Sequence, residues 1–253
     1  MRRSLLMIAA LLLGTALLPA NCLAADLVRI SGPVQNPGLH GDENDDRLAI
    51  ALLEAKPTSS AFLPATFFTR RKAELEQIRL KAGVVHDLQA LNSLDNDLLR
   101  ELSGRLRLWV DSMPVTGRVR ILPYPRLMQL QPKLDPRIQA GDAVRFLERP
   151  TTIQVVGAVA ENCTLPHHPL RSALDYTKDC AATKFADPDS IIVIQVDSTV
   201  QTLGAGAWNR ADPQPVSPGG VILVPLAKKY LQTVDADFNA DLAALIATQA
   251  ANP

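Results

Sequence analysis

Residues 27–39 read Leu-Val-Arg-Ile-Ser-Gly-Pro-Val-Gln-Asn-Pro-Gly-Leu, and residues 152–159 read Thr-Ile-Gln-Val-Val-Gly-Ala-Val. In both stretches β-branched residues lead to a single glycine, Gly32 or Gly157, followed by a small residue and then valine. A glycine inside a strand pattern marks a bulge or a close backbone approach. A type II turn favours proline followed by glycine at its two central positions, and the segment Asn36-Pro37-Gly38 fits this pattern. The two stretches predict two β-hairpins of one kind.

A second pair of similar segments follows the two hairpins, one after each, and each segment is expected to form the last strand of its unit. Residues 140–150 and residues 217–225 both read as a glycine turn that leads into a strand. Residues 47–55 have helical spacing directly after the first hairpin, and a hairpin followed by one crossing helix begins a β-grasp unit. The sequence therefore predicts an α+β fold with two β-grasp-like domains. The alternative is that strand–glycine–strand phrases recur by chance in a β-rich protein.

The segment from about residue 65 to residue 113 differs in composition from both units. It is rich in Leu, Glu, Arg and Gln, and we expect a helical hairpin inserted in the first domain, with Gly83 between its helices and Pro114 ending it. The expected stripe on its second helix consists of Leu98, Leu102, Leu106 (or Arg105), Trp109 and Met113. Strands are expected again at residues 119–122 and 127–130, before the closing strand at 144–147.

The predicted domain order has four parts: a signal peptide at residues 1–25, a first domain at 26–149 that contains the insertion, a second domain at 150–228, and a C-terminal amphipathic helix within 229–253. The apolar stripe of that helix contains Phe238, Leu242, Leu245 and Ile246. Two interpretations stay open at this point. The stripe packs on its own domain, or it docks on a partner or a second copy.

The N-terminus predicts export. A basic start, an apolar run from Leu5 to Leu18 and small residues near Ala24 form a secretory signal, and the run is too short to span a membrane. We therefore expect a periplasmic protein without a stable membrane anchor after cleavage. If Cys22 leaves with the signal, Cys163 and Cys180 remain as an even pair, which indicates a disulfide in an oxidising compartment.

Composition and motifs exclude several function classes. Lys and Arg balance Asp and Glu at 26 each, which argues against a nucleic-acid partner. No hydrolase elbow, zinc-protease helix, P-loop or dinucleotide fingerprint occurs, so we expect no catalytic residues, no metal and no cofactor. The adjacent His167 and His168 point apart in an extended chain and are not expected to chelate one metal together.

The segment from Gly32 to Gly38 resembles the opening of the soluble-ligand-binding β-grasp domains of polysaccharide export proteins. The whole layout, with Trp208-Asn209 before a Pro-Gly closing strand and a terminal helix, is similar to the periplasmic capsule-biosynthesis family of the GfcC type. The resemblance implies a non-enzymatic accessory of capsule or exopolysaccharide biosynthesis or export. Its partners would be polysaccharide or export proteins of the cell envelope. One departure is that the second hairpin has Glu-Asn-Cys-Thr at 161–164 in place of the Pro-Gly turn.

The candidate ligand or partner surface from the sequence consists of Gly32, Asn36, Pro37, Gly38, Trp208 and Asn209. Two alternative functions remain. A secreted glycan hydrolase would need two facing carboxylates, for which Asp175, Asp187, Asp189 and Asp197 are candidates by residue type. An envelope interaction module unrelated to polysaccharide would need none of these groups. The oligomeric state and the polysaccharide are not predicted.

Overall fold

The structure is a computed structural model that describes residues 27–41 and 46–249. The predicted signal peptide, with Cys22, lies outside the described residues, as do Asp42 and the three residues that follow it. Two five-stranded mixed sheets form the molecule, which confirms the α+β class and the pair of β-grasp-like domains. None of the helices in the described ranges is long and apolar enough to cross a membrane.

The first sheet has the strand order β2-β1-β5-β3-β4. Its strands are β1 (Val28–Ser31), β2 (Gly38–His40), β3 (Phe67–Thr69), β4 (Arg118–Val119) and β5 (Ala143–Arg145). The second sheet has the order β7-β6-β10-β8-β9. Its strands are β6 (Thr152–Gly157), β7 (Cys163–Pro166), β8 (Ser190–Ile194), β9 (Val200–Gly204) and β10 (Val221–Val224). Matching strands occupy matching places, so the second sheet repeats the topology of the first.

The repeat extends to individual backbone contacts. The closing strand of each unit runs parallel to its first strand, β5 beside β1 and β10 beside β6. Gly32 and Gly157 have φ of +95° and +101°, and a Cβ on them would lie 2.0 Å from the Phe146 carbonyl oxygen and 2.3 Å from that of Val224. Only glycine fits a backbone that turns through positive φ this close to the neighbouring strand. The two glycines singled out in the sequence are therefore structurally equivalent.

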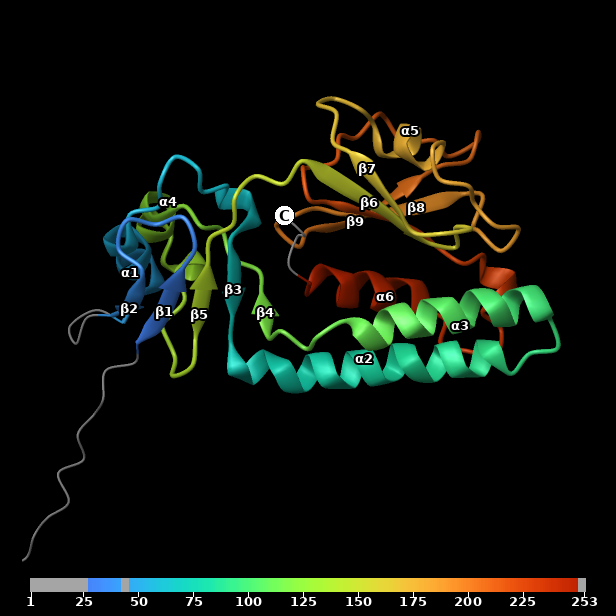
Figure 1. Cartoon of the computed structure of the whole chain (residues 1–253), viewed down its shortest axis with the longest axis horizontal. Helices are drawn as coiled ribbons and strands as arrows, with labels where there is room; N and C mark the ends of the chain where they lie inside the picture. The colour runs from blue at the N-terminus through green and yellow to red at the C-terminus, as the bar shows by residue number, and fades with distance from the viewer. Residues whose placement is uncertain (1–26, 42–45, 250–253) are drawn as a thin grey trace, which may run out of the picture.

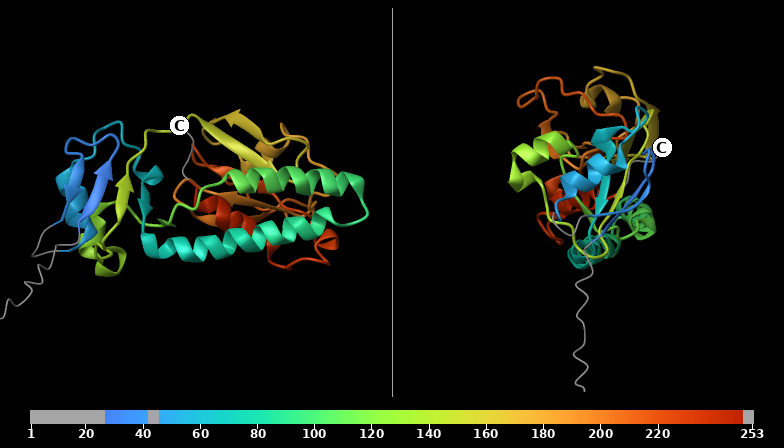
Figure 2. Two further views of the ribbon diagram at one scale, coloured as in Figure 1. Left: turned by 60° about the horizontal axis from the view of Figure 1, so that its bottom comes forward. Right: turned by 90° about the vertical axis from the view of Figure 1, so that its left-hand side faces the viewer.

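The helices are α1 (Leu48–Ala55), α2 (Arg71–Asn92), α3 (Asp97–Ser112), α4 (Pro125–Leu130), α5 (Ala173–Thr177) and α6 (Phe238–Ala247). Three short 3-10 segments complete the list: η1 (Leu63–Ala65), η2 (Pro132–Leu134) and η3 (Lys228–Tyr230). The hairpin α2–α3 connects β3 to β4, where the second domain has only the short turn between β8 and β9. It runs from the first sheet along the whole second domain, with α6 between it and the second sheet (Figures 1 and 2).

The hairpin shares a hydrophobic core with the second domain. Buried side chains of α3, among them Leu102, Leu106 and Val110, belong to one cluster with Ile153 and Leu223 of the second sheet. The first sheet has its own smaller core around Phe68, Met128 and Phe146. The insertion therefore belongs to the first domain by sequence and to the second by packing.

Three expectations about the first domain were wrong. Gly83 lies inside α2, and the break falls at Ser93–Asn96, where the Asn96 side chain caps α3 by accepting a hydrogen bond from Leu99 N at 3.2 Å. Leu98 is 53% exposed, and Leu99 is buried instead, because Leu99 lies on the side of α3 that faces the core.

The third error concerns residues 127–130, which form part of α4 and not a strand. Pro125 stands in the first turn of this helix, a position that proline favours, and Met128 is fully buried in the first core. Helical packing against α1 thus outweighs the β-like composition of the segment.

Two further expectations concern the second domain. Cys163 and Cys180 form a disulfide, which closes a separation of 17 residues and ties β7 to the segment after α5. The terminal stripe of Phe238, Leu242, Leu245 and Ile246 is buried in the second core, with α6 packed on α2 and on strands β8 and β9. These four side chains pack on their own chain, so they do not form a free docking face.

The close approach at Gly157 gives a stability prediction. We expect Gly157→Ala to lower the free energy of unfolding by about 2–4 kcal/mol, because the new methyl group combines positive φ with overlap on the Val224 carbonyl. Urea unfolding followed by circular dichroism measures the change. The matched control is Gly83→Ala, where a Cβ would meet nothing within 4 Å in mid-helix and should raise stability by about 0.5–1 kcal/mol. A Gly157→Ala variant with an unchanged free energy of unfolding would contradict this role of the glycine in the repeated unit.

Candidate functional site

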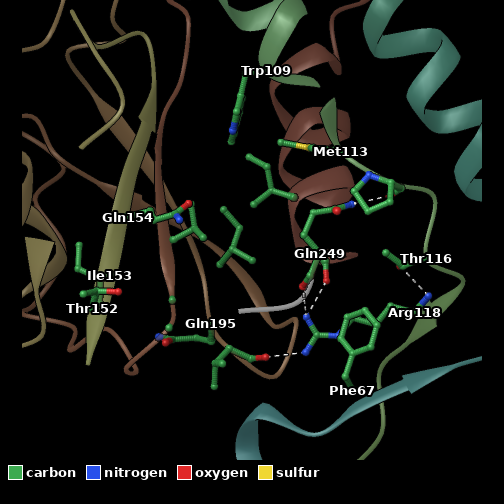
Figure 3. Close-up of a pocket in the computed structure, with 18 of the residues that line it drawn as sticks. Phe67, Trp109, Met113, Thr116, Arg118, Thr152, Ile153, Gln154, Gln195 and Gln249 are labelled. Carbon is green, nitrogen blue, oxygen red and sulfur yellow. Dashed lines mark hydrogen bonds between the residues drawn. The ribbon is translucent and has the colours of Figure 1, made fainter. Parts of the chain in front are cut away.

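The junction of the two domains holds a pocket of about 380 Å³. Its walls come from the end of α3, from β5 of the first sheet, from β6 and β10 of the second, and from the end of α6. Trp109 stands at one end, Arg118 and Phe67 at the other, and Gln154 and Gln195 along the side (Figure 3). A volume of this size lies within the range of small-molecule sites in proteins.

Arg118 is buried at the base of the pocket and holds three segments together. Its guanidinium donates hydrogen bonds to the carbonyl oxygens of Val196 at 2.6 Å, Gln249 at 2.7 Å and Ala247 at 3.2 Å. The last two carbonyls lie at the C-terminus of α6, the negative end of the helix dipole. Burial lowers the pKa of Arg118 to about 10, the attraction of Asp197 acts in the opposite direction, and the group stays charged at neutral pH.

Gln77 and Thr116 fix the strand that carries Arg118. The buried Gln77 amide donates to Arg118 O at 2.9 Å and accepts from Gly117 N at 2.8 Å, which fastens β4 to α2. The Thr116 hydroxyl donates to Thr248 O at 2.7 Å. Arg118 is thus a positioning residue, since its donors are directed at backbone carbonyls of this chain.

Asp197 connects the turn after β8 with the first domain. Its carboxylate accepts from Arg120 Nη2 at 3.2 Å and from the Thr199 hydroxyl at 2.8 Å. Burial acts to raise the pKa of Asp197, but the hydrogen bonds from Thr199 and Arg120 lower it overall below its usual value. Asp197 lines a second, more apolar hollow of about 270 Å³ together with Tyr124.

Some of the polar groups that line the pocket remain available to a ligand. The Gln154 amide, the Trp109 indole N–H and the Arg145 guanidinium line it and make no hydrogen bond within the described part of the chain. Gln195, in contrast, uses both amide atoms on the backbone of Ser217 and Pro215. The arrangement can therefore bind a polar molecule with one aromatic wall, one amide and one cation.

The six surface residues proposed from the sequence lie elsewhere, since none of them lines this pocket. The Asn36 amide donates to Glu54 O at 2.7 Å, which anchors the first hairpin turn to α1. Trp208 is 79% exposed, and its indole N–H donates to Asp189 Oδ1 at 2.9 Å, while the Asn209 amide donates to Asp189 O. The turn at Asn36 therefore belongs to the first domain, and the loop with Trp208 and Asn209 belongs to the second.

The carboxylates proposed for a hydrolase each make local contacts. Asp175 binds Ser172 and Lys178 at the start of α5, Asp187 accepts from Ser190 and from Asp189 N, and Asp189 holds Trp208. None of these aspartates, nor Asp197, lines the interdomain pocket. In the described ranges no group of three or more His, Cys, Asp or Glu side chains could hold a metal ion.

Sequence reasoning missed the residues that line the pocket. Trp109 was placed in the buried stripe of the insertion, yet it is half-buried at the edge of the core. Arg118, Arg145 and Gln154 carry no motif in the sequence. The one available signal was that Arg145 lies in the expected closing strand of the first unit and Gln154 in the expected opening strand of the second.

Comparison with known proteins gives two similarities. Residues 161–251 match the family model described as "Capsule biosynthesis GfcC C-terminal". The chain is also 28% identical over 138 residues to a protein of Escherichia coli (strain K12) named "Uncharacterized protein YjbG". That alignment covers 54% of this chain and 56% of YjbG, so the chain spans about half the length of this relative.

The three carbonyl contacts of Arg118 give a second prediction. We expect Arg118→Lys to lower the free energy of unfolding by about 2–4 kcal/mol, because an ammonium group cannot reproduce the planar fork and leaves carbonyls unpaired. Chemical unfolding measures the loss. Arg79→Lys, on the exposed face of α2, is the matched control and should change stability by less than about 0.5 kcal/mol. Equal effects of the two variants would contradict the role of Arg118.

Asp197 gives a prediction of pH dependence. Because its pKa in the folded protein is depressed, its stabilising contribution is present above its usual pKa of 3.8 and is lost as the pH falls through the lower folded value. We expect Asp197→Asn to destabilise the protein at pH 7 by up to about 1 kcal/mol. The difference from the unmodified protein should shrink below pH 3.8. Unfolding curves of both proteins measured from pH 7 to below pH 3.8 test this prediction. A difference in the free energy of unfolding that does not change with pH would contradict the lowered pKa of Asp197.

Proposed function

Because the chain is GfcC-like over residues 161–251, we propose that it is a periplasmic, non-enzymatic accessory of capsule or exopolysaccharide biosynthesis or export. The observation that carries the proposal is the match of residues 161–251, which include β7 to β10 and α6, to a capsule-biosynthesis family model. The disulfide between Cys163 and Cys180 supports an oxidising compartment such as the periplasm.

The proposed mode of action is binding of glycan at the interdomain pocket. Its available groups, an indole, an amide and a guanidinium, are ones that bind a polar ring without changing it. The four aspartates considered for hydrolysis are engaged in turns, caps and ion pairs outside the pocket, which supports a role without turnover.

The proposal predicts a defect in the cell coat. Deletion of the gene in the source organism should reduce surface polysaccharide, and a plasmid with the unmodified gene should restore it. Gln154→Trp, which fills the pocket from β6, should fail to restore the coat. Gln201→Trp, on the exposed side of β9, is the matched control and should restore it.

An unchanged coat after deletion would contradict the proposal. Activity is tested separately with purified protein and the organism's own polysaccharide. Release of reducing ends in that assay would refute the non-enzymatic part and favour the hydrolase alternative.

A further inference from the structure

The interdomain pocket is positively charged. Arg118 and Arg145 both line it, and the lining residues in the described part of the chain include no Asp or Glu. The whole sequence has 26 basic and 26 acidic residues, so its balanced composition gives no indication of this local excess of positive charge. A site whose walls carry cations without counter-charges favours an anionic ligand.

The two arginines differ in what they can offer a ligand. The donors of Arg118 are directed at three backbone carbonyls, so its guanidinium is committed to the fold. Arg145 is exposed on β5, where its backbone pairs with β1 and β3, but its guanidinium makes no hydrogen bond or ion pair with another described residue. The Asp197 carboxylate, which interacts with Arg118, is occupied by Arg120 and Thr199 and does not line this pocket.

Phe67 holds Arg145 beside the pocket. The guanidinium carbons of Arg118 and Arg145 lie 5.0 Å and 5.5 Å from the centroid of the same Phe67 ring. Such cation–π contacts restrict a long side chain while leaving its N–H groups free to bind. Arg145 is therefore partly pre-organised, which lowers the entropic cost of binding a planar anion.

The remaining lining offers contacts to further sugar rings of the same glycan, since Trp109 lies at the end of the pocket away from Phe67 (Figure 3). Trp109 provides an aromatic wall, and the Gln154 amide can both donate to and accept from hydroxyl groups. The carboxylate is the planar anion that a guanidinium binds through two parallel hydrogen bonds. An indole, an amide and one available arginine together match a sugar that carries a carboxylate.

We propose that the interdomain pocket binds an acidic sugar residue of a glycan, with Arg145 as the partner of its carboxylate. This inference rests on the proposed function, since it specifies the class of glycan for the same pocket. Arg145 is then the residue that determines specificity, whereas Arg118 maintains the shape of the site.

The test compares trigalacturonate with its methyl ester, in which a neutral methyl ester replaces each carboxylate. By calorimetry on the full chain we expect the acid to bind about 10- to 100-fold more tightly than the ester, as for hydrogen bonds to a charged group. Arg145→Gln should remove this preference. Arg79→Gln, which removes one positive charge from the exposed face of α2, should retain it.

A second measurement does not depend on any variant. Raising NaCl from about 50 to 500 mM should weaken binding of the acid to the unmodified protein and leave binding of the ester nearly unchanged. Equal affinity for the two probes, or a preference that survives Arg145→Gln, would overturn the inference. Failure of both probes to bind would also overturn it. The gene-deletion assay decides the proposed function independently of these outcomes.

Discussion

The α2–α3 hairpin fixes the arrangement of the molecule, because it cannot bury its apolar face within its own domain. Leu102, Leu106 and Val110 are buried in one cluster with the strands of the second sheet, while the ends of the hairpin are joined to β3 and β4 of the first. Burial of this stripe is favourable only where the second domain lies against it. The relative position of the two sheets, and the pocket between them, follow from this packing.

Arg118 completes the same arrangement at the base of the hairpin. It stands just after α3, on β4, and its guanidinium reaches the turn after β8 and the end of α6. Moving a cation from water into the protein interior costs free energy. For Arg118, three carbonyl oxygens and the negative end of the α6 dipole offset that cost. Arg118 can thus be required for the shape of the site without contacting a ligand. Arg145 then provides the positive charge that a ligand can bind.

The repeated unit could be predicted from the sequence because its constraints are local. Gly32 and Gly157 are needed wherever a strand turns through positive φ against a neighbouring carbonyl, and this need is visible in a short phrase. The spacing of leucines correctly placed Leu102 and Leu106 on the buried face of α3, but it chose Leu98 in place of Leu99, because leucine stands at both positions and only the packing of the helix decides between them. The strand β9 was missed because its exposed residues on a sheet edge show no apolar run. The pocket could not be predicted, since Phe67, Trp109, Arg145 and Gln154 meet only after the hairpin docks on the second domain.

The most direct test of this account is differential scanning calorimetry of the chain from residue 26 onward. If the hairpin of one domain supplies part of the core of the other, the two sheets unfold together. The account predicts one transition, with equal calorimetric and van't Hoff enthalpies. Two separable transitions, one for each sheet, would show that the domains are independent and that the pocket between them is not a fixed site.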